Sequence, residues 1–200
     1  MRKEAETKIK SLQKGSKGYL AKRKKQAAVI VAFFAVLILA LIIVGILLNG
    51  SNKNLLTLIA IVLVLPGAKF AVNLIVISPH KPVSEELFKE VETNARSLTR
   101  LYDNVIGTTE RPVGAPAIAY CDNALCIYTD EEKTNVDFLT KQVKNFLQGD
   151  SIFINVSVYN DEKQFVKRIA NLNSNIESST KKPIEGRDEK IRASLETMLI

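Results

Sequence analysis

Few residues of this chain have the types and spacing that catalysis, redox chemistry or metal binding requires. The one histidine, His80, lies between two prolines in the segment 79–82. A catalytic histidine needs a nucleophile and an orienting carboxylate beside it, and the sequence around this segment indicates neither. We therefore expect His80 to be a solvated linker residue.

The two cysteines, Cys121 and Cys126, are separated by four residues, whereas redox and zinc pairs are usually separated by two. They flank Asp122-Asn123, two residues that favour a tight hairpin turn. Such a turn would place Cys121 opposite Ala124 and Cys126 opposite Ala119, so both thiols would share one face diagonally. We expect two small buried apolar side chains in a reducing compartment.

The elements that would position these residues divide the chain by composition. Apolar residues make up 46% and charged residues 24% of the 200 residues, and the net charge is +7. The segment 1–25 has ten Lys/Arg and two Glu, whereas 83–200 has fifteen Lys/Arg and nineteen Asp/Glu. The basic character therefore belongs to the N-terminal segment. Because the remaining domain is mildly acidic, we expect no nucleic-acid partner.

Two apolar runs, 26–48 and 55–77, predict a transmembrane helical hairpin over 26–78. The first run has 23 uncharged residues, about 34 Å of helix against a hydrocarbon core of about 30 Å. The second contains Pro66, expected to bend the helix, and Lys69, expected to extend to the headgroups.

The distribution of positive charge predicts the orientation of this hairpin. Only Lys53 lies in the connecting loop, whereas ten Lys/Arg precede the first span. The positive-inside rule therefore places both termini in the cytoplasm. We expect an integral protein of a bacterial plasma membrane, with the lipid bilayer as a partner. The residues predicted at the membrane interface are Lys22, Arg23, Lys24, Lys25 and Lys69.

Beyond the hairpin, apolar periodicity predicts a small cytoplasmic α/β domain over 83–173, followed by a linker and a C-terminal helix in 174–200. The predicted order is α-β-β-α-β-α, with a parallel crossover between the second and third strands. The predicted elements are helix 84–104, strands 117–120 and 125–129, helix 134–148, strand 151–159 and helix 161–172, with a loop over 107–116. The final helix would either dock on the domain or present its apolar stripe to a partner helix.

The element order resembles that of restriction-endonuclease-like folds, a resemblance that implies an Asp and a (D/E)-x-K motif on adjacent strands. Here Asp122 lies in a turn, and the acidic run 130–132 with Lys133 lies between a strand and a helix. The motif is therefore missing. Glycine-rich phosphate loops are also missing. We predict no catalytic, cofactor or metal site.

The leading functional hypothesis is a membrane-anchored protein, not an enzyme, whose α/β domain binds a protein partner or regulates a membrane complex. The partner could also be a second copy of the chain. The candidate contact residues are Tyr102, Arg111, Ile191, Leu195 and Met198. The alternative is a membrane-tethered hydrolase or nuclease-like enzyme that uses Asp122, Asp130 or Asp150. A third hypothesis, a transporter subunit, predicts that the hairpin alone retains the partner.

Overall fold

A computed structural model describes residues 14–51, 54–132, 134–178 and 186–200, and these form two compact units. One unit, Ala21–Pro79, contains the apolar helices and is called the apolar hairpin below. The other unit consists of the described residues of 14–20 and of His80–Ile200, and it is called the domain. The elements, in chain order, are helices α2 (Tyr19–Asn49), α3 (Leu55–Ile77) and α4 (Glu85–Asn94), strands β1 (Thr99–Ile106), β2 (Val113–Cys121) and β3 (Ala124–Tyr128), helix α5 (Val136–Gly149), strand β4 (Asn155–Tyr159), and helices α6 (Glu162–Glu177) and α7 (Arg187–Met198).

The apolar hairpin consists of two long helices that are long and apolar enough to cross a membrane. Helix α3 runs through Pro66 to Ile77, so residues 70–77 complete the helix. The two helices pack through Phe34 and Phe70, whose ring centroids lie 5.6 Å apart. A Cβ on Gly67 would lie 3.4 Å from the Cβ of Phe34. Gly67 therefore faces Phe34 across the two helices.

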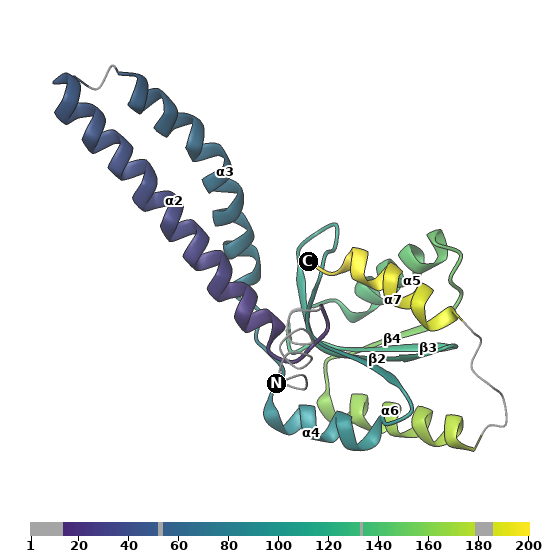
Figure 1. The fold of residues 1–200 in the computed structure, drawn as a ribbon. Coiled ribbons are helices and arrows are strands. Elements are labelled where there is room, and N and C mark those ends of the chain that lie inside the picture. Colours follow the sequence, from purple (N-terminus) through teal and green to yellow (C-terminus); the bar gives the residue numbers. More distant parts are fainter. Residues whose placement is uncertain (1–13, 52–53, 133, 179–185) are drawn as a thin grey trace. The chain divides into compact units, whose positions relative to one another are not determined.

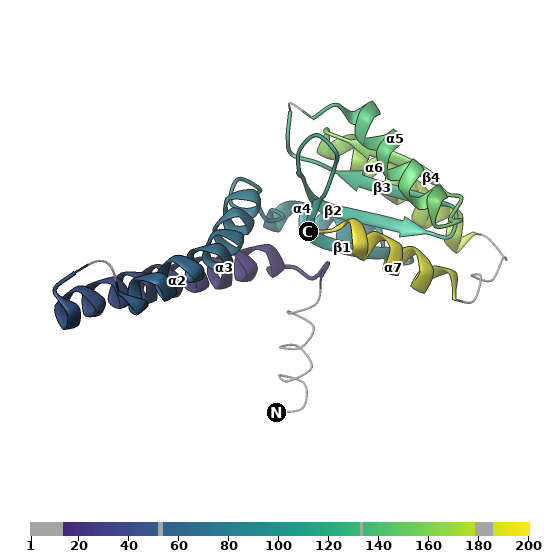
Figure 2. The same cartoon turned by 90° about the horizontal axis from the view of Figure 1, so that it is seen from above.

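The domain has three layers, a four-stranded sheet between two pairs of helices (Figures 1 and 2). Helices α5 and α7 bury their apolar residues on one face, together with Ile118 and Ile127. Helices α4 and α6 cover the other face, together with Ala117 and Tyr128. Because the strands are covered on both faces, β2 and β3 are apolar at almost every position.

The sheet order is β1-β2-β3-β4, with antiparallel pairs β1–β2 and β2–β3 and a parallel pair β3–β4. The hairpin between β2 and β3 confirms the predicted register, since Cys121 pairs with Ala124 and Ala119 with Cys126. The parallel pair, with α5 between its strands, confirms the predicted crossover connection. The coarse expectation of an α/β domain is therefore correct.

Strand β1 is the main error of the sequence analysis, which predicted a single helix over 84–104. Helix α4 ends at Asn94, and Thr99–Ile106 is a strand. The observed order from α4 onward is therefore α-β-β-β-α-β-α-α. The apolar residues of β1 face both helical layers, so their spacing matches a helix as well as it matches a buried strand. Strand β2 also begins at Val113, within the segment predicted to be a loop.

Two other boundaries differ clearly from the predictions, the start of β4 and the end of α6. Strand β4 is shorter than 151–159, although Ile152 and Ile154 before it are buried. Helix α6 continues to Glu177, through the start of the predicted linker. It continues because Asn173 is buried and satisfied: it accepts from the Ser97 amide at 2.7 Å and donates to Glu177 at 2.8 Å. The rest of that linker, residues 179–185, lies outside the described residues.

Candidate functional site

The most elaborate polar cluster in the domain holds the two chain segments that lead into and out of the apolar hairpin. We call it the root cluster and define it as residues 14–18, residues 80–83, Asp103 and Glu131. All of these residues belong to the domain unit. Asp103 comes from β1, and Glu131 comes from the loop after β3.

The incoming segment adds a backbone contact to the outer edge of β1. The carbonyl of Gly15 accepts a hydrogen bond from the Tyr102 amide at 2.7 Å. Gly15 has a φ of +85°, and a Cβ there would lie 2.5 Å from Cδ2 of Leu101. Glycine therefore meets both the left-handed backbone conformation and the close approach.

Two lysines fasten the same segment by side-chain contacts. Lys14 Nζ donates to the carbonyls of Glu196 at 3.1 Å and Leu199 at 2.9 Å, at the C-terminal end of α7, where a cation is favourable. Lys17 Nζ lies 2.7 Å from Glu85 and 4.0 Å from the ring centroid of Phe88. Lys17 lowers the pKa of the exposed Glu85 carboxyl, by its hydrogen bond first and by its charge second.

Asp103 connects the incoming and outgoing segments through one carboxylate. Its Oδ2 accepts from the Gly18 amide at 2.5 Å, and its Oδ1 accepts from the Val83 amide at 2.7 Å. Asp103 is 1% exposed and has a φ of 56°. Burial raises the pKa of this carboxyl, and the two amide hydrogen bonds and Lys17 act in the opposite direction.

The register of the sheet explains how Asp103 can leave the strand geometry. Tyr102 pairs with Ala117 and Asn104 with Ala115, so Pro116 stands opposite Asp103 without a paired bridge. Proline has no N–H to give to the ladder. Since Asp tolerates the left-handed region better than most residues, the strand can turn locally and aim this carboxylate at the two segments.

His80 holds the outgoing segment through Glu131. The ring Nδ1 lies 2.9 Å from Oε1 of Glu131, and the same oxygen accepts from the Gly114 amide at 2.7 Å. The other oxygen, Oε2, lies 3.4 Å from the Thr134 hydroxyl and 3.9 Å from Nη2 of Arg111. His80 is 7% exposed, so the expectation of a solvated linker residue is wrong.

The contacts of the root cluster attach the two chain segments to the rest of the domain. Its carboxylates accept from backbone amides and its lysines cap or pair with groups of the domain. The Thr134 hydroxyl is bonded to Glu131 and to Arg111, which differs from the nucleophile–histidine contact of a catalytic triad. Within the described residues, no group of three His, Cys, Asp or Glu side chains could hold a metal ion.

The predicted partner contacts fall into different environments. Tyr102 is buried, its hydroxyl donates to Glu92 at 2.7 Å, and burial raises the pKa of that hydroxyl. Arg111 remains about half exposed beside Glu131. The apolar stripe of α7 docks on the domain, one of the two expected outcomes. The stripe residues buried in that core are Ile191, Leu195, Met198 and Leu199.

The three aspartates of the enzyme hypothesis do not meet in one site. Asp122 lies in the turn before β3, whereas Asp130 follows β3 and is exposed. The two therefore stand at opposite ends of that strand, roughly 20 Å or more apart along extended chain. Asp150 follows α5 and accepts a hydrogen bond from the Ser194 hydroxyl.

The cysteines are free, and both pack in the same apolar cluster, which agrees with the prediction of two small apolar side chains on one face. Cys126 is buried and Cys121 is partly buried. Burial raises the pKa of Cys126 to about 11, so this thiol is protonated at neutral pH and unreactive.

The predicted membrane-interface residues lie on the helices of the apolar hairpin. Lys22, Arg23, Lys24 and Lys25 belong to the first turns of α2, and Lys69 is exposed on α3. Lys24 Nζ donates to the Ser78 carbonyl at 2.6 Å, at the C-terminal end of α3. The sequence of residues 21–79 contains no Asp or Glu.

The sequence analysis missed Asp103, Glu131 and the pair Gly15 and Gly18. Asp103 was assigned to a helix, where an aspartate is unremarkable, so the error over β1 concealed it. The two glycines, three residues apart in the basic segment, were the available signal for a specific backbone conformation. No protein-family model, curated protein or solved structure matches this chain.

Proposed function

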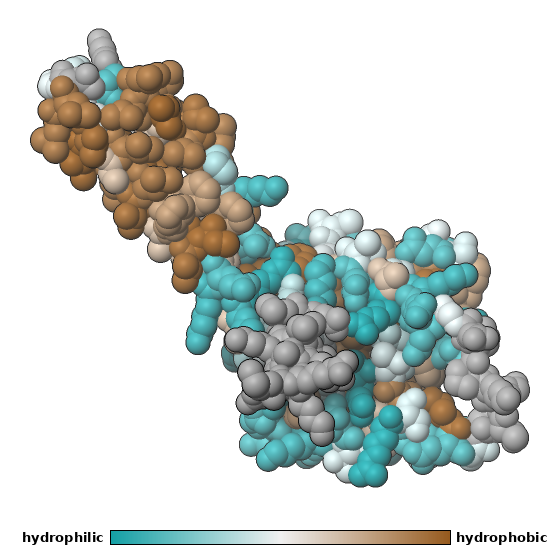
Figure 3. Space-filling view, viewed as in Figure 1, coloured by the Kyte–Doolittle hydropathy of each residue, from teal (hydrophilic) through white to brown (hydrophobic). Residues whose placement is uncertain are grey.

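We propose that this chain is a two-span membrane protein that presents its α/β domain at the cytoplasmic face, where the domain binds a protein partner or regulates a membrane complex. The observation that carries this proposal is the apolar surface of α2 and α3. Among the described residues, every exposed large hydrophobic side chain except Phe146 and Phe153 lies between positions 29 and 75 (Figure 3). A bilayer would remove this surface from water, at about 25 cal/mol per Å².

The root cluster supports a single side for both ends of the hairpin. Segments 14–18 and 80–83 are bonded to the same domain through Asp103. A folded domain cannot lie on both sides of a bilayer, so a hairpin rooted in this way returns to the side from which it enters. The ten Lys/Arg before the first span favour the cytoplasmic side.

The test is a crosslinked pull-down from native membranes followed by mass spectrometry. It compares the full chain with a chain truncated after Pro82. A partner captured by the full chain alone supports the docking role. A partner retained by the truncated chain would instead assign the function to the hairpin, as in a transporter subunit.

A matched control separates docking from catalysis by carboxylates. In the full chain, Asp122→Asn, Asp130→Asn and Asp150→Asn are combined. We expect this variant to retain the partner and the cellular phenotype of the full chain, because Asp122 and Asp130 lie at opposite ends of β3 and Asp150 is bonded to Ser194. Loss of the phenotype with the partner retained would support the hydrolase or nuclease-like alternative.

A further inference from the structure

The two edge strands of the sheet, β1 and β4, differ in whether their outer backbone groups are hydrogen-bonded. The outer edge of β1 is paired: Tyr102 donates to Gly15, Gly107 donates to the Met198 carbonyl at 2.9 Å, and Ile200 donates to the Val105 carbonyl at 2.9 Å. The N-terminal segment and the chain end after α7 therefore cover this edge. Over the part of the chain that the structure describes, β4 pairs only with β3.

The register shows which groups of β4 face outward. The Asn155 amide donates to Asn123, and the Tyr159 carbonyl accepts from Thr129, each at 2.9 Å. In a parallel pair alternate residues bond to the neighbouring strand. Residues 155, 157 and 159 therefore bond to β3, and the N–H and C=O groups of Val156 and Val158 point to the open side.

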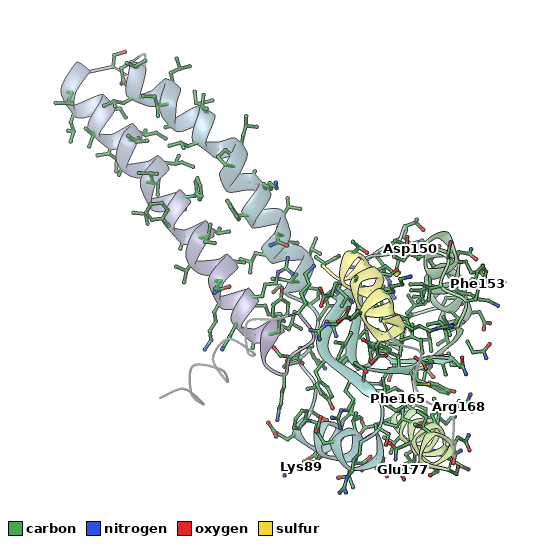
Figure 4. The ribbon with its side chains drawn as sticks, turned by 45° about the vertical axis from the view of Figure 1, so that its right-hand side comes forward. Lys89, Asp150, Phe153, Phe165, Arg168 and Glu177 are labelled. Carbon is green, nitrogen blue, oxygen red and sulfur yellow. The ribbon has the colours of Figure 1, made fainter. Side chains whose placement is uncertain are left out.

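The composition of this edge lacks the usual protection against strand pairing. Residues 151–160 contain no charged residue and no proline, and edge strands are normally guarded by lysine, proline or a bulge. Among the described residues of the domain, two large hydrophobic side chains are exposed, and both lie near this edge. Phe153 is 69% exposed two residues before β4 (Figure 4), and Phe146 lies on α5, which packs against β4.

We propose that β4 is a homodimer interface, in which β4 of a second copy pairs with it in antiparallel orientation. In the register that uses the outward groups, Val156 bonds to Val158 of the second copy and Ser157 lies opposite its own equivalent. This pairing joins the two sheets into one of eight strands. It makes four new backbone hydrogen bonds around the two-fold axis.

A second copy fits this edge for two reasons. An uncharged strand meets no like-charge repulsion when it pairs with itself. The covered edge of β1 also prevents head-to-tail pairing of β4 with β1, which would otherwise form open filaments. The pairing of β4 with β4 is isologous and closes at two chains. This inference uses the domain alone and does not depend on the membrane location of the hairpin.

Disulfide trapping in the full chain tests the register. In a background with Cys121→Ala and Cys126→Ala, Ser157→Cys faces its own equivalent in a non-hydrogen-bonded pair, with Cα atoms about 4.5 Å apart, within disulfide range. We expect mild oxidation of the purified chain in detergent to convert most of this variant to a covalent dimer.

Asn155→Cys is the matched control, because Asn155 is on the same strand and more exposed than Ser157. In the proposed register its two equivalents lie about 14 Å apart, beyond disulfide reach. We expect at least about tenfold less covalent dimer from this variant under the same oxidation. Equal trapping of both variants, or none of Ser157→Cys, would overturn the proposal.

A second variant tests the dimer without cysteines. Val156→Pro removes an outward N–H and leaves the β3 ladder intact, because β3 bonds to the residues on either side. We expect light scattering to report a dimer for the wild-type chain and a monomer for this variant, with unchanged circular dichroism. A wild-type monomer, or a dimer that survives Val156→Pro, would contradict the proposal.

Discussion

Large apolar side chains are exposed on the apolar hairpin and buried in the domain. On α2 and α3, large side chains such as Leu39 (59% exposed) and Leu47 (77%) face outward. In the domain, Phe165 and Tyr120 are fully buried and packed. The difference agrees with the proposed function, in which lipid surrounds the apolar hairpin and water surrounds the domain. The root cluster lies where the chain passes from one to the other.

The largest expected effect comes from the domain core. Phe165→Ala should lower the free energy of unfolding of the domain by about 3–5 kcal/mol, because it leaves a cavity between α6 and the sheet. Thermal unfolding of the full chain in detergent would measure this. Phe153→Ala, at an exposed position, should change stability by about 0.5 kcal/mol or less. Equal effects would show that the core is not packed as described.

The next prediction separates exposure to lipid from exposure to water. Leu39→Arg should disfavour membrane insertion by about 2.5–3.5 kcal/mol, because it places a charge near the middle of the first span. Alkaline extraction of membranes measures the inserted fraction. Phe153→Arg is the control at a similarly exposed position of the domain, and it should extract like the wild-type chain. If Leu39→Arg also behaves like the wild type, α2 does not face lipid.

A smaller effect is expected at the root cluster. Asp103→Asn keeps the shape and tolerates the positive φ, but an amide oxygen can replace only one of the two acceptors. One buried amide, of Gly18 or Val83, is left without its bond. The expected loss of stability is about 1–3 kcal/mol, measured by thermal unfolding. Faster amide exchange in residues 14–20 would show that the stability is lost at the root cluster.

The stability difference between the wild type and Asp103→Asn should depend on pH with a defined sign. Burial raises the pKa of Asp103 from its ordinary value of 3.8, so the folded state binds this proton more tightly than the unfolded chain does. The stabilising contribution of that proton is complete below the unfolded value and is lost as the pH rises through the folded value. The stability difference between wild type and Asp103→Asn should therefore be largest in acid. A difference that grows toward neutral pH would contradict this.

The smallest effect is expected from the surface ion pair between Lys17 of the root cluster and Glu85 of α4. Lys17→Gln removes the contact with Glu85, and exposed ion pairs contribute little to stability. Its visible consequence should be local, a modest rise in amide exchange at residues 14–20 without a change in melting temperature. Lys89→Gln, a neighbouring lysine of α4, should leave that exchange unchanged. A large drop in melting temperature would mean that the pair does more than hold the segment.

Sequence reasoning succeeded where the chemistry is local. The turn Asp122-Asn123 and the two apolar runs depend on neighbouring residues, and they predicted the register between β2 and β3 and the two long helices α2 and α3. It failed at β1, because a strand buried on both faces has no period of two. It also failed at the root cluster, since the contact between Gly18 and Asp103 joins residues 85 positions apart. No local pattern indicates such a contact.

The measurement that tests the central claim most directly is labelling of single cysteines by a membrane-impermeant thiol reagent in intact cells. The background is Cys121→Ala with Cys126→Ala, and the probes are Ser51→Cys in the hairpin connection and Asn175→Cys on α6, both exposed. We predict that Ser51→Cys is labelled from outside, and that Asn175→Cys is labelled only after the membrane is opened. Labelling of both positions in intact cells, or of Asn175→Cys alone, would contradict a hairpin that crosses the membrane twice below a cytoplasmic domain.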